Sequence, residues 1–190
     1  MIHLHDTILQ MTLEDDSWSA PFDNDDCSTV TPVPYGDLHN VSPYVATPQA
    51  AIDLLLSELS VTSSDLLVDL GCGVGSINIT AARRYNTPGV GVDIDPDLIK
   101  TCEVSAKEAG MDHLVTFRVE DVEDTDLSEA TVVVSFLVPR HLKLLKPKLL
   151  KFLSSGGRLA CYHYPLQGVT PHKIVQLKQG MEKNIYIYRD

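Results

Sequence analysis

The sequence has no lysine or arginine in its first 82 positions. Twelve Asp and Glu residues fall in that stretch, whereas residues 83–190 carry fourteen acids and fifteen Lys and Arg residues, so the net charge is −11. An acidic amino-terminal region is unlike a mitochondrial transit peptide, which is rich in Arg and poor in acids. The scarcity of basic residues also disfavours a nucleic-acid partner, because phosphate contacts need Lys and Arg.

Other common patterns are missing as well. No apolar run approaches the ~20 residues that span a bilayer, and no basic segment precedes an apolar one as in a signal peptide. The four cysteines form no CxxC pair, and the seven histidines form no HxxxH or HExxH pattern. We therefore expect an intracellular, cytoplasmic protein with reduced thiols, no membrane segment and no metal site.

The chain divides into an amino-terminal tail and one domain. Residues 1–40 mix polar residues and proline with isolated apolar residues and show no sustained hydrophobic period, which predicts a flexible acidic tail. Residues 41–190 are expected to form the domain. Its first helix should be capped by Thr47, because Pro48 suits the first helical position and Ile52, Leu55, Leu56 and Leu59 then share one face.

Strand and helix patterns alternate through the domain. We expect strands at 66–70, 90–94, 115–119, 131–136 and 158–164, and further helices at 76–85, 95–110 and 140–153. The helix at 140–153 should bury a Leu face and expose a Lys face, although its basic side could instead dock an acidic partner. A hairpin, 174–177 and 185–188, turns near Gly180. The pattern predicts an α/β fold with a doubly wound, mostly parallel seven-strand sheet and an antiparallel carboxy-terminal hairpin strand at one edge.

The most informative motif follows the first expected strand and reads Asp69-Leu-Gly71-Cys-Gly73-Val-Gly75. Glycine at these three positions lets the backbone turn sharply and approach a ligand with no Cβ in the way. The helix that follows begins with free N–H groups. Because ligands of open α/β sheets bind at the carboxyl ends of the strands, we expect the ligand site here.

Two kinds of ligand could use such a loop. A dinucleotide site has the pattern GxGxxG, and Ser76 stands where its third glycine would be. The pattern is instead acid-x-G-x-G-x-G, with Asp69 two residues before Gly71. A carboxylate in that place suits a cationic group, such as the amino-acid end of S-adenosylmethionine, and does not suit a pyrophosphate.

Two more acids follow the next two strands. Asp93 lies 22 residues after Gly71, where an acid can accept hydrogen bonds from both ribose hydroxyls. Asp121 follows the third strand, where it could meet the adenine amino group. One such acid alone would more often be a helix cap or a solvated loop charge. Three acids at three successive strand ends favour a nucleoside ligand.

On these residues the chain resembles the class I S-adenosylmethionine-dependent methyltransferases, which have a seven-strand Rossmann-like fold, over roughly residues 42–190. The resemblance implies that Ile94 and Val122 pack on the adenine and that the backbone of the glycine loop contacts the cofactor. The expected cofactor-binding residues are Asp69, Gly71, Gly73, Gly75, Asp93, Ile94, Asp121 and Val122.

A narrower resemblance is to the protein-lysine methyltransferases that act on ATP synthase subunit c and the adenine nucleotide translocase. It rests on PYVATP at 43–48, FLVP at 136–139 and the link at 165–172, which is too short for the helix that most class I enzymes carry there. The chain departs from that group at Val74 and Ser76, where Asp and Arg are usual. The resemblance implies a protein lysine as acceptor, but not a particular substrate.

The acceptor side is expected at the ends of the fourth and fifth strands. A lysine must lose its proton before it attacks the methyl group, and aromatic walls favour the neutral amine. The candidates for this channel are Tyr44, Phe136, His163 and Tyr164, with core packing as the alternative for each. The fourth strand lacks the Asn/Asp-Pro-Pro-aromatic signature of enzymes that methylate base amines. A small-molecule or RNA methyltransferase, or a cofactor-binding module without activity, stays open as an alternative.

Overall fold

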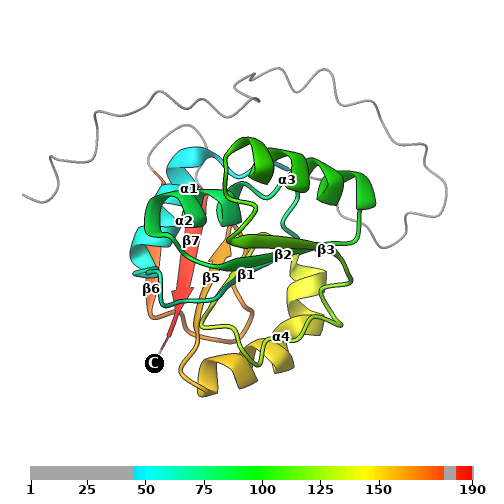
Figure 1. Cartoon of the computed structure of the whole chain (residues 1–190). Helices are drawn as coiled ribbons and strands as arrows, with labels where there is room; N and C mark the ends of the chain where they lie inside the picture. Colours follow the sequence, from blue (N-terminus) through cyan, green and yellow to red (C-terminus); the bar gives the residue numbers. More distant parts are fainter. Residues whose placement is uncertain (1–44, 178–182, 190) are drawn as a thin grey trace, which may run out of the picture. The chain divides into compact units, whose positions relative to one another are not determined.

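A computed structural model describes residues 45–177 and 183–189, which form a seven-stranded sheet with helices on both faces (Figure 1). The helices are α1 (Gln49–Glu58), α2 (Ser76–Tyr85), α3 (Pro96–Glu108) and α4 (Pro139–Ser154). The strands are β1 (Leu67–Leu70), β2 (Gly89–Asp93), β3 (Val115–Val119), β4 (Val132–Ser135), β5 (Arg158–Tyr162), β6 (Lys173–Gln176) and β7 (Asn184–Tyr188). The expected tail and the hairpin turn near Gly180 lie outside the described residues.

The sheet has the order β3-β2-β1-β4-β5-β7-β6. The strands from β3 to β5 are parallel, whereas β7 runs antiparallel to both β5 and β6. The α/β fold class is therefore confirmed. The antiparallel strand β7 lies one place inside the edge, with β6 outside it. Ile185 and Ile187 of β7 are at most 1% exposed and pack in the cluster that includes α1, whereas β6 is largely exposed.

Successive strand residues face opposite sides of the sheet, as the period of two requires. Val132 and Val134 pack in a cluster with α1 and α2, whereas Val133 packs in the cluster that includes α4. Figure 1 accordingly shows α1, α2 and α3 on one side of the sheet and α4 on the other. No helix joins β5 to β6, as the short link at 165–172 predicts. None of the four described helices has the length and hydrophobicity of a membrane-spanning segment.

Two helices refine the expected pattern. In α1, the four predicted core residues are at most 1% exposed, but Pro48 rather than Thr47 occupies the N-cap. Its carbonyl accepts the amides of Ala51 and Ile52, so the helix starts one residue later than expected. In α4, the interior Leu face is confirmed in part, since Leu144 and Leu150 lie 51% and 41% exposed on the outer side.

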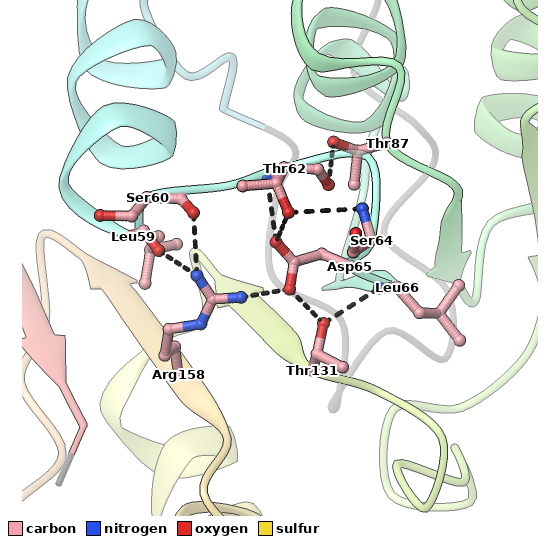
Figure 2. A network of polar contacts seen from close by, with 9 residues as sticks. All are labelled: Leu59, Ser60, Thr62, Ser64, Asp65, Leu66, Thr87, Thr131 and Arg158. Atoms are coloured by element: carbon pink, nitrogen blue, oxygen red, sulfur yellow. Dashed lines mark hydrogen bonds and ion pairs between the residues drawn. The ribbon is translucent and has the colours of Figure 1, made fainter.

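A polar network joins the amino ends of β1, β4 and β5, at the edge opposite the glycine loop (Figure 2). Asp65 is 8% exposed and pairs with Arg158, which also donates to the carbonyls of Leu59 (2.5 Å) and Ser60 (3.0 Å). The same carboxylate accepts hydrogen bonds from Thr131 Oγ1 (2.7 Å) and from the Thr62 amide (2.8 Å). One carboxylate thus links the end of α1 to three strands.

Candidate active site

The glycine loop connects β1 to α2 at the carboxyl edge of the sheet, next to the switch in strand order between β1 and β4. Gly71 and Gly75 have φ values of +79° and +78°, in the left-handed region that glycine alone adopts freely. A Cβ on Gly75 would also lie 2.7 Å from the Phe117 ring, and one on Gly71 would lie 2.9 Å from Leu137 Cδ2. The loop therefore needs glycine both for its turn and for its packing.

Asp93, the last residue of β2, holds this loop in place. Its Oδ2 accepts the amide of Gly73 (3.0 Å) and its Oδ1 accepts the amide of Asp95 (3.1 Å). Cys102 on α3 adds a bond from its thiol to the Gly73 carbonyl (3.1 Å). A carboxylate has about four acceptor positions, so Asp93 can still receive two ligand hydroxyls. The sequence spacing indicated the ligand contact, but it carried no signal for the contact with Gly73.

Asp69 on β1 is a buried acid, 2% exposed. Burial, followed by the nearby charge of Asp93, raises the pKa of Asp69 to about 7. Within residues 45–177 and 183–189 no Lys or Arg forms an ion pair with it. A buried carboxylate without a cation is costly, and a cationic ligand group placed beside it would restore its ionised form. This agrees with the expected preference of the loop for a cationic ligand.

Replacing Asp69 with Asn should change how stability depends on pH. A carboxyl group with a pKa of about 7 in the folded chain and 3.8 in the unfolded chain binds more protons when folded. The free energy of unfolding of the ligand-free protein should therefore fall as the pH rises from about 4 to about 7. The variant should lose this dependence and be stabilised, relative to the wild type, by on the order of 2–4 kcal/mol more at pH 8 than at pH 4. Urea unfolding at both pH values measures this, and parallel pH profiles would contradict it.

The other expected cofactor residues follow β2 and β3. Ile94 is 51% exposed directly after β2, an uncovered apolar side chain at the carboxyl edge. Val122 is half-buried after β3. Asp121 is exposed, and its Oδ1 accepts the amide of Glu123 (2.9 Å), which leaves its second oxygen for a ligand. The roles of these three residues toward an adenine remain predictions. Their positions after two adjacent strands, at the same edge of the sheet, are compatible with those roles.

The aromatic candidates after β4 and β5 form a contiguous cluster. The ring centroid of Phe136 lies 4.8 Å from that of Tyr162 and 6.2 Å from that of His163. The ring centroids of His163 and Tyr164 are 4.3 Å apart. Tyr162 was not among the sequence candidates. The predicted strand at 158–164 ends at Tyr162, because His163 has a φ of +72°. Tyr44 lies outside the described residues.

This turn separates the two tyrosines. Tyr162 packs with Phe136 on the side of α1 and α2, whereas Tyr164 packs against the cluster that includes α4. A straight strand would have placed both on one face, as the period of two implies. Leu137, next to Phe136 in the chain, is the residue that packs on Gly71. Phe136 itself follows β4 at the carboxyl edge of the sheet, the edge that also carries the glycine loop.

These residues fit S-adenosylmethionine. The left-handed glycines bring bare backbone to the carboxyl edge, and the buried Asp69 calls for a cationic group. The adjacent Asp93 retains acceptor positions for hydroxyl groups. A pyrophosphate would meet two carboxylates at this edge and would be repelled.

Comparison with known proteins agrees with this geometry. The sequence profile of the ANTKMT methyltransferase domain matches residues 69–173. A protein-lysine N-methyltransferase of Saccharolobus islandicus (strain REY15A) is 34% identical over 77% of this chain and 92% of its own length. The mouse adenine nucleotide translocase lysine N-methyltransferase is 30% identical over 70% of this chain, which spans 58% of that protein.

A solved structure is similar over the same region. It is described as an RNA methyltransferase from Salinibacter ruber in complex with S-adenosyl-L-homocysteine, and it is 39% identical with a TM-score of 0.72. The similarity covers 76% of this chain and 92% of that one. The domain match, the relatives and the site together show that this chain belongs to the ANTKMT methyltransferase domain family and is an S-adenosylmethionine-dependent methyltransferase.

Proposed function

We propose that the chain transfers a methyl group to the side-chain nitrogen of a lysine in a protein. The aromatic cluster of Phe136, Tyr162, His163 and Tyr164 at the carboxyl ends of β4 and β5 carries this proposal. A lysine ammonium has no lone pair, so it must lose its proton before it can attack a methyl carbon. Apolar and aromatic surroundings lower the pKa of an amine by disfavouring its charged form. The names of the archaeal and mouse relatives support the same acceptor.

Each part of the site would then have a distinct task. When bound, S-adenosylmethionine supplies a sulfonium methyl group that a neutral amine can attack. The glycine loop and Asp69 would hold its amino-acid end, Asp93 would hold the ribose, and Asp121, Ile94 and Val122 would hold the adenine. The protein contributes alignment and exclusion of water, for which no acid–base dyad is needed.

His163 adds no positive charge of its own to the acceptor side. Burial, together with the charge of Lys183, lowers the pKa of His163. The imidazole is therefore neutral at physiological pH and does not repel an incoming ammonium. Phe136 and Tyr164 supply the aromatic surface on either side of it, which is the role expected of them from the sequence.

RNA is the second candidate acceptor, because the similar Salinibacter ruber protein is described as an RNA methyltransferase. The charge of this chain favours protein. A net charge of −11 repels phosphate and attracts a cationic peptide segment. A small-molecule acceptor would not require the attraction between the acidic enzyme and a cationic peptide.

Incubating the protein with cell extract and methyl-labelled S-adenosylmethionine should label protein, and the label should lie on lysine. A protein identified in this way can then serve as the acceptor at subsaturating concentration. The rate of its methylation should rise by up to about tenfold per pH unit below the pKa of the acceptor lysine, because the fraction of neutral amine rises by the same factor. Fractionation of protein, RNA and metabolites, followed by amino-acid analysis, measures the first result. Label confined to RNA or metabolites would overturn the lysine proposal and leave the methyltransferase assignment intact.

A further inference from the structure

A lysine of the chain itself lies on the aromatic cluster. Lys183, immediately before β7, places its Nζ 5.4 Å from the ring centroid of Phe136 and 5.7 Å from that of Tyr162. Both distances fall within the ~6 Å over which an ammonium is attracted to an aromatic face. The two rings meet at an interplanar angle of 70°, so they form a corner that contacts the cation from two sides.

The backbone holds Lys183 in this place. Its carbonyl accepts the amide of Leu177 (3.2 Å), and the carbonyl of the next residue, Asn184, accepts the amide of His163 (2.8 Å). These bonds tie the lysine to β6 and to the end of β5. In the part of the chain that the structure describes, no carboxylate forms an ion pair with Lys183. Among the described residues, the two aromatic rings are the partners recorded within reach of its ammonium.

The corner also lies at the carboxyl edge of the sheet, the edge that carries the glycine loop. Phe136 follows β4, and its neighbour Leu137 packs against Gly71 of the glycine loop. Tyr162 ends β5, the next strand in the sheet. A lysine side chain of a substrate has the same four-carbon stem and ammonium as Lys183, so the two would compete for the same rings.

We propose that the corner formed by Phe136 and Tyr162 is an alkylammonium-binding site and that Lys183 is the chain's own occupant of it, which a substrate lysine displaces. This proposal rests on the proposed lysine acceptor. It predicts that Lys183 weakens the binding of an external ammonium. Removing the side chain opens the site, whereas arginine at this position keeps a cation on the rings.

The test is a titration of the protein with n-butylammonium chloride, followed through the ring resonances of Phe136 and Tyr162 by NMR. Lys183→Ala should bind at least fivefold more tightly than the wild type, and Lys183→Arg should bind like the wild type. Lys107→Ala on α3, a matched loss of charge away from the rings, should also bind like the wild type. Adding Phe136→Leu to Lys183→Ala should remove the gain. Unchanged affinity for S-adenosylhomocysteine shows that the variants are folded.

Equal affinities of the wild type and Lys183→Ala, or shifts confined to resonances away from the two rings, would overturn the proposal. The titration contains no methyl donor, so its result does not depend on which molecule is methylated. Label found only in RNA in the transfer assay would instead overturn the lysine acceptor, and the two failures can be told apart.

Discussion

Asp93→Ala should weaken the binding of S-adenosylmethionine and S-adenosylhomocysteine at least tenfold, and at least about a hundredfold if both ribose hydroxyls bind the carboxylate. Each charge-assisted hydrogen bond contributes roughly 1.5–3 kcal/mol. The substitution also removes the acceptor of the Gly73 amide, so the loop itself should be less well ordered. Isothermal titration calorimetry gives the dissociation constants directly.

Asp97→Ala is the matched control for this experiment. Asp97 lies in the first turn of α3, four residues further along, and is exposed. Its removal should leave the affinity within about twofold, because Asp97 is assigned no contact with the cofactor. Its charge near the helix terminus contributes less than about 1 kcal/mol, and that contribution is to the stability of the fold. If Asp93→Ala bound the cofactor as tightly as the wild type, Asp93 would be an anchor of the loop and not a ribose ligand. In that case the ligand-free variant should still have a lower melting temperature than the wild type, because it lacks the hydrogen bond to the Gly73 amide.

Asp65→Ala should lower the free energy of unfolding by about 3 kcal/mol, which is the lower end of the range for breaking a buried ion pair. The lower end applies because the Arg158 side chain is 22% exposed and keeps its bonds to two carbonyls of the α1 terminus. The substitution leaves the Thr62 amide and the Thr131 hydroxyl without the carboxylate that accepts them. Urea unfolding monitored by circular dichroism measures the change.

The pH dependence of this variant provides a second measurement. Burial by itself would raise the pKa of Asp65, but hydrogen bonds from Thr131 and Thr62 and the charge of Arg158 outweigh it and lower the pKa below 3.8. An acid with a lowered folded-state pKa stabilises the fold above its unfolded value, and the contribution is lost as the pH falls through the folded value. The difference between wild type and Asp65→Ala should therefore be largest above about pH 4 and shrink in stronger acid.

Glu58→Ala serves as the control for Asp65→Ala. Glu58 pairs with Lys173 at 2.8 Å, but the Lys173 side chain is 51% exposed, so solvent screens the pair. An exposed ion pair contributes less than about 1 kcal/mol. Equal losses of stability for the two variants would show that the network in Figure 2 is no stronger than a surface pair.

Much of the site was predictable because local patterns specify it. The helix at 76–85 and the strand at 115–119 have the expected boundaries, since a change of hydrophobic period marks both ends. Glycine at 71, 73 and 75 predicted a sharp turn of the backbone, and all three residues have positive φ. The resemblance at these residues predicted the methyltransferase family, which the comparisons confirm.

Other features could not be predicted because they depend on residues far apart in the sequence. The bond between Asp93 and Gly73 spans 20 positions, and the pair of Asp65 with Arg158 spans 93. Tyr162 and Tyr164 lie on different faces because His163, between them, has a left-handed backbone conformation. Since His163 is not a glycine, no local pattern predicts a turn there. The contact of Lys183 with Phe136 needs β7 to lie beside β5, an arrangement that no local pattern records.

The sequence by itself determined the order and approximate bounds of the helices and strands, the place of the glycine loop and which acids follow which strands, because periodicity and backbone preference act over a few residues. Only the tertiary structure decided the strand order, the anchor of the glycine loop and the partners of Asp65, Tyr162 and Lys183. These depend on the register between distant strands, and a one-residue change of register would exchange the faces of every side chain involved.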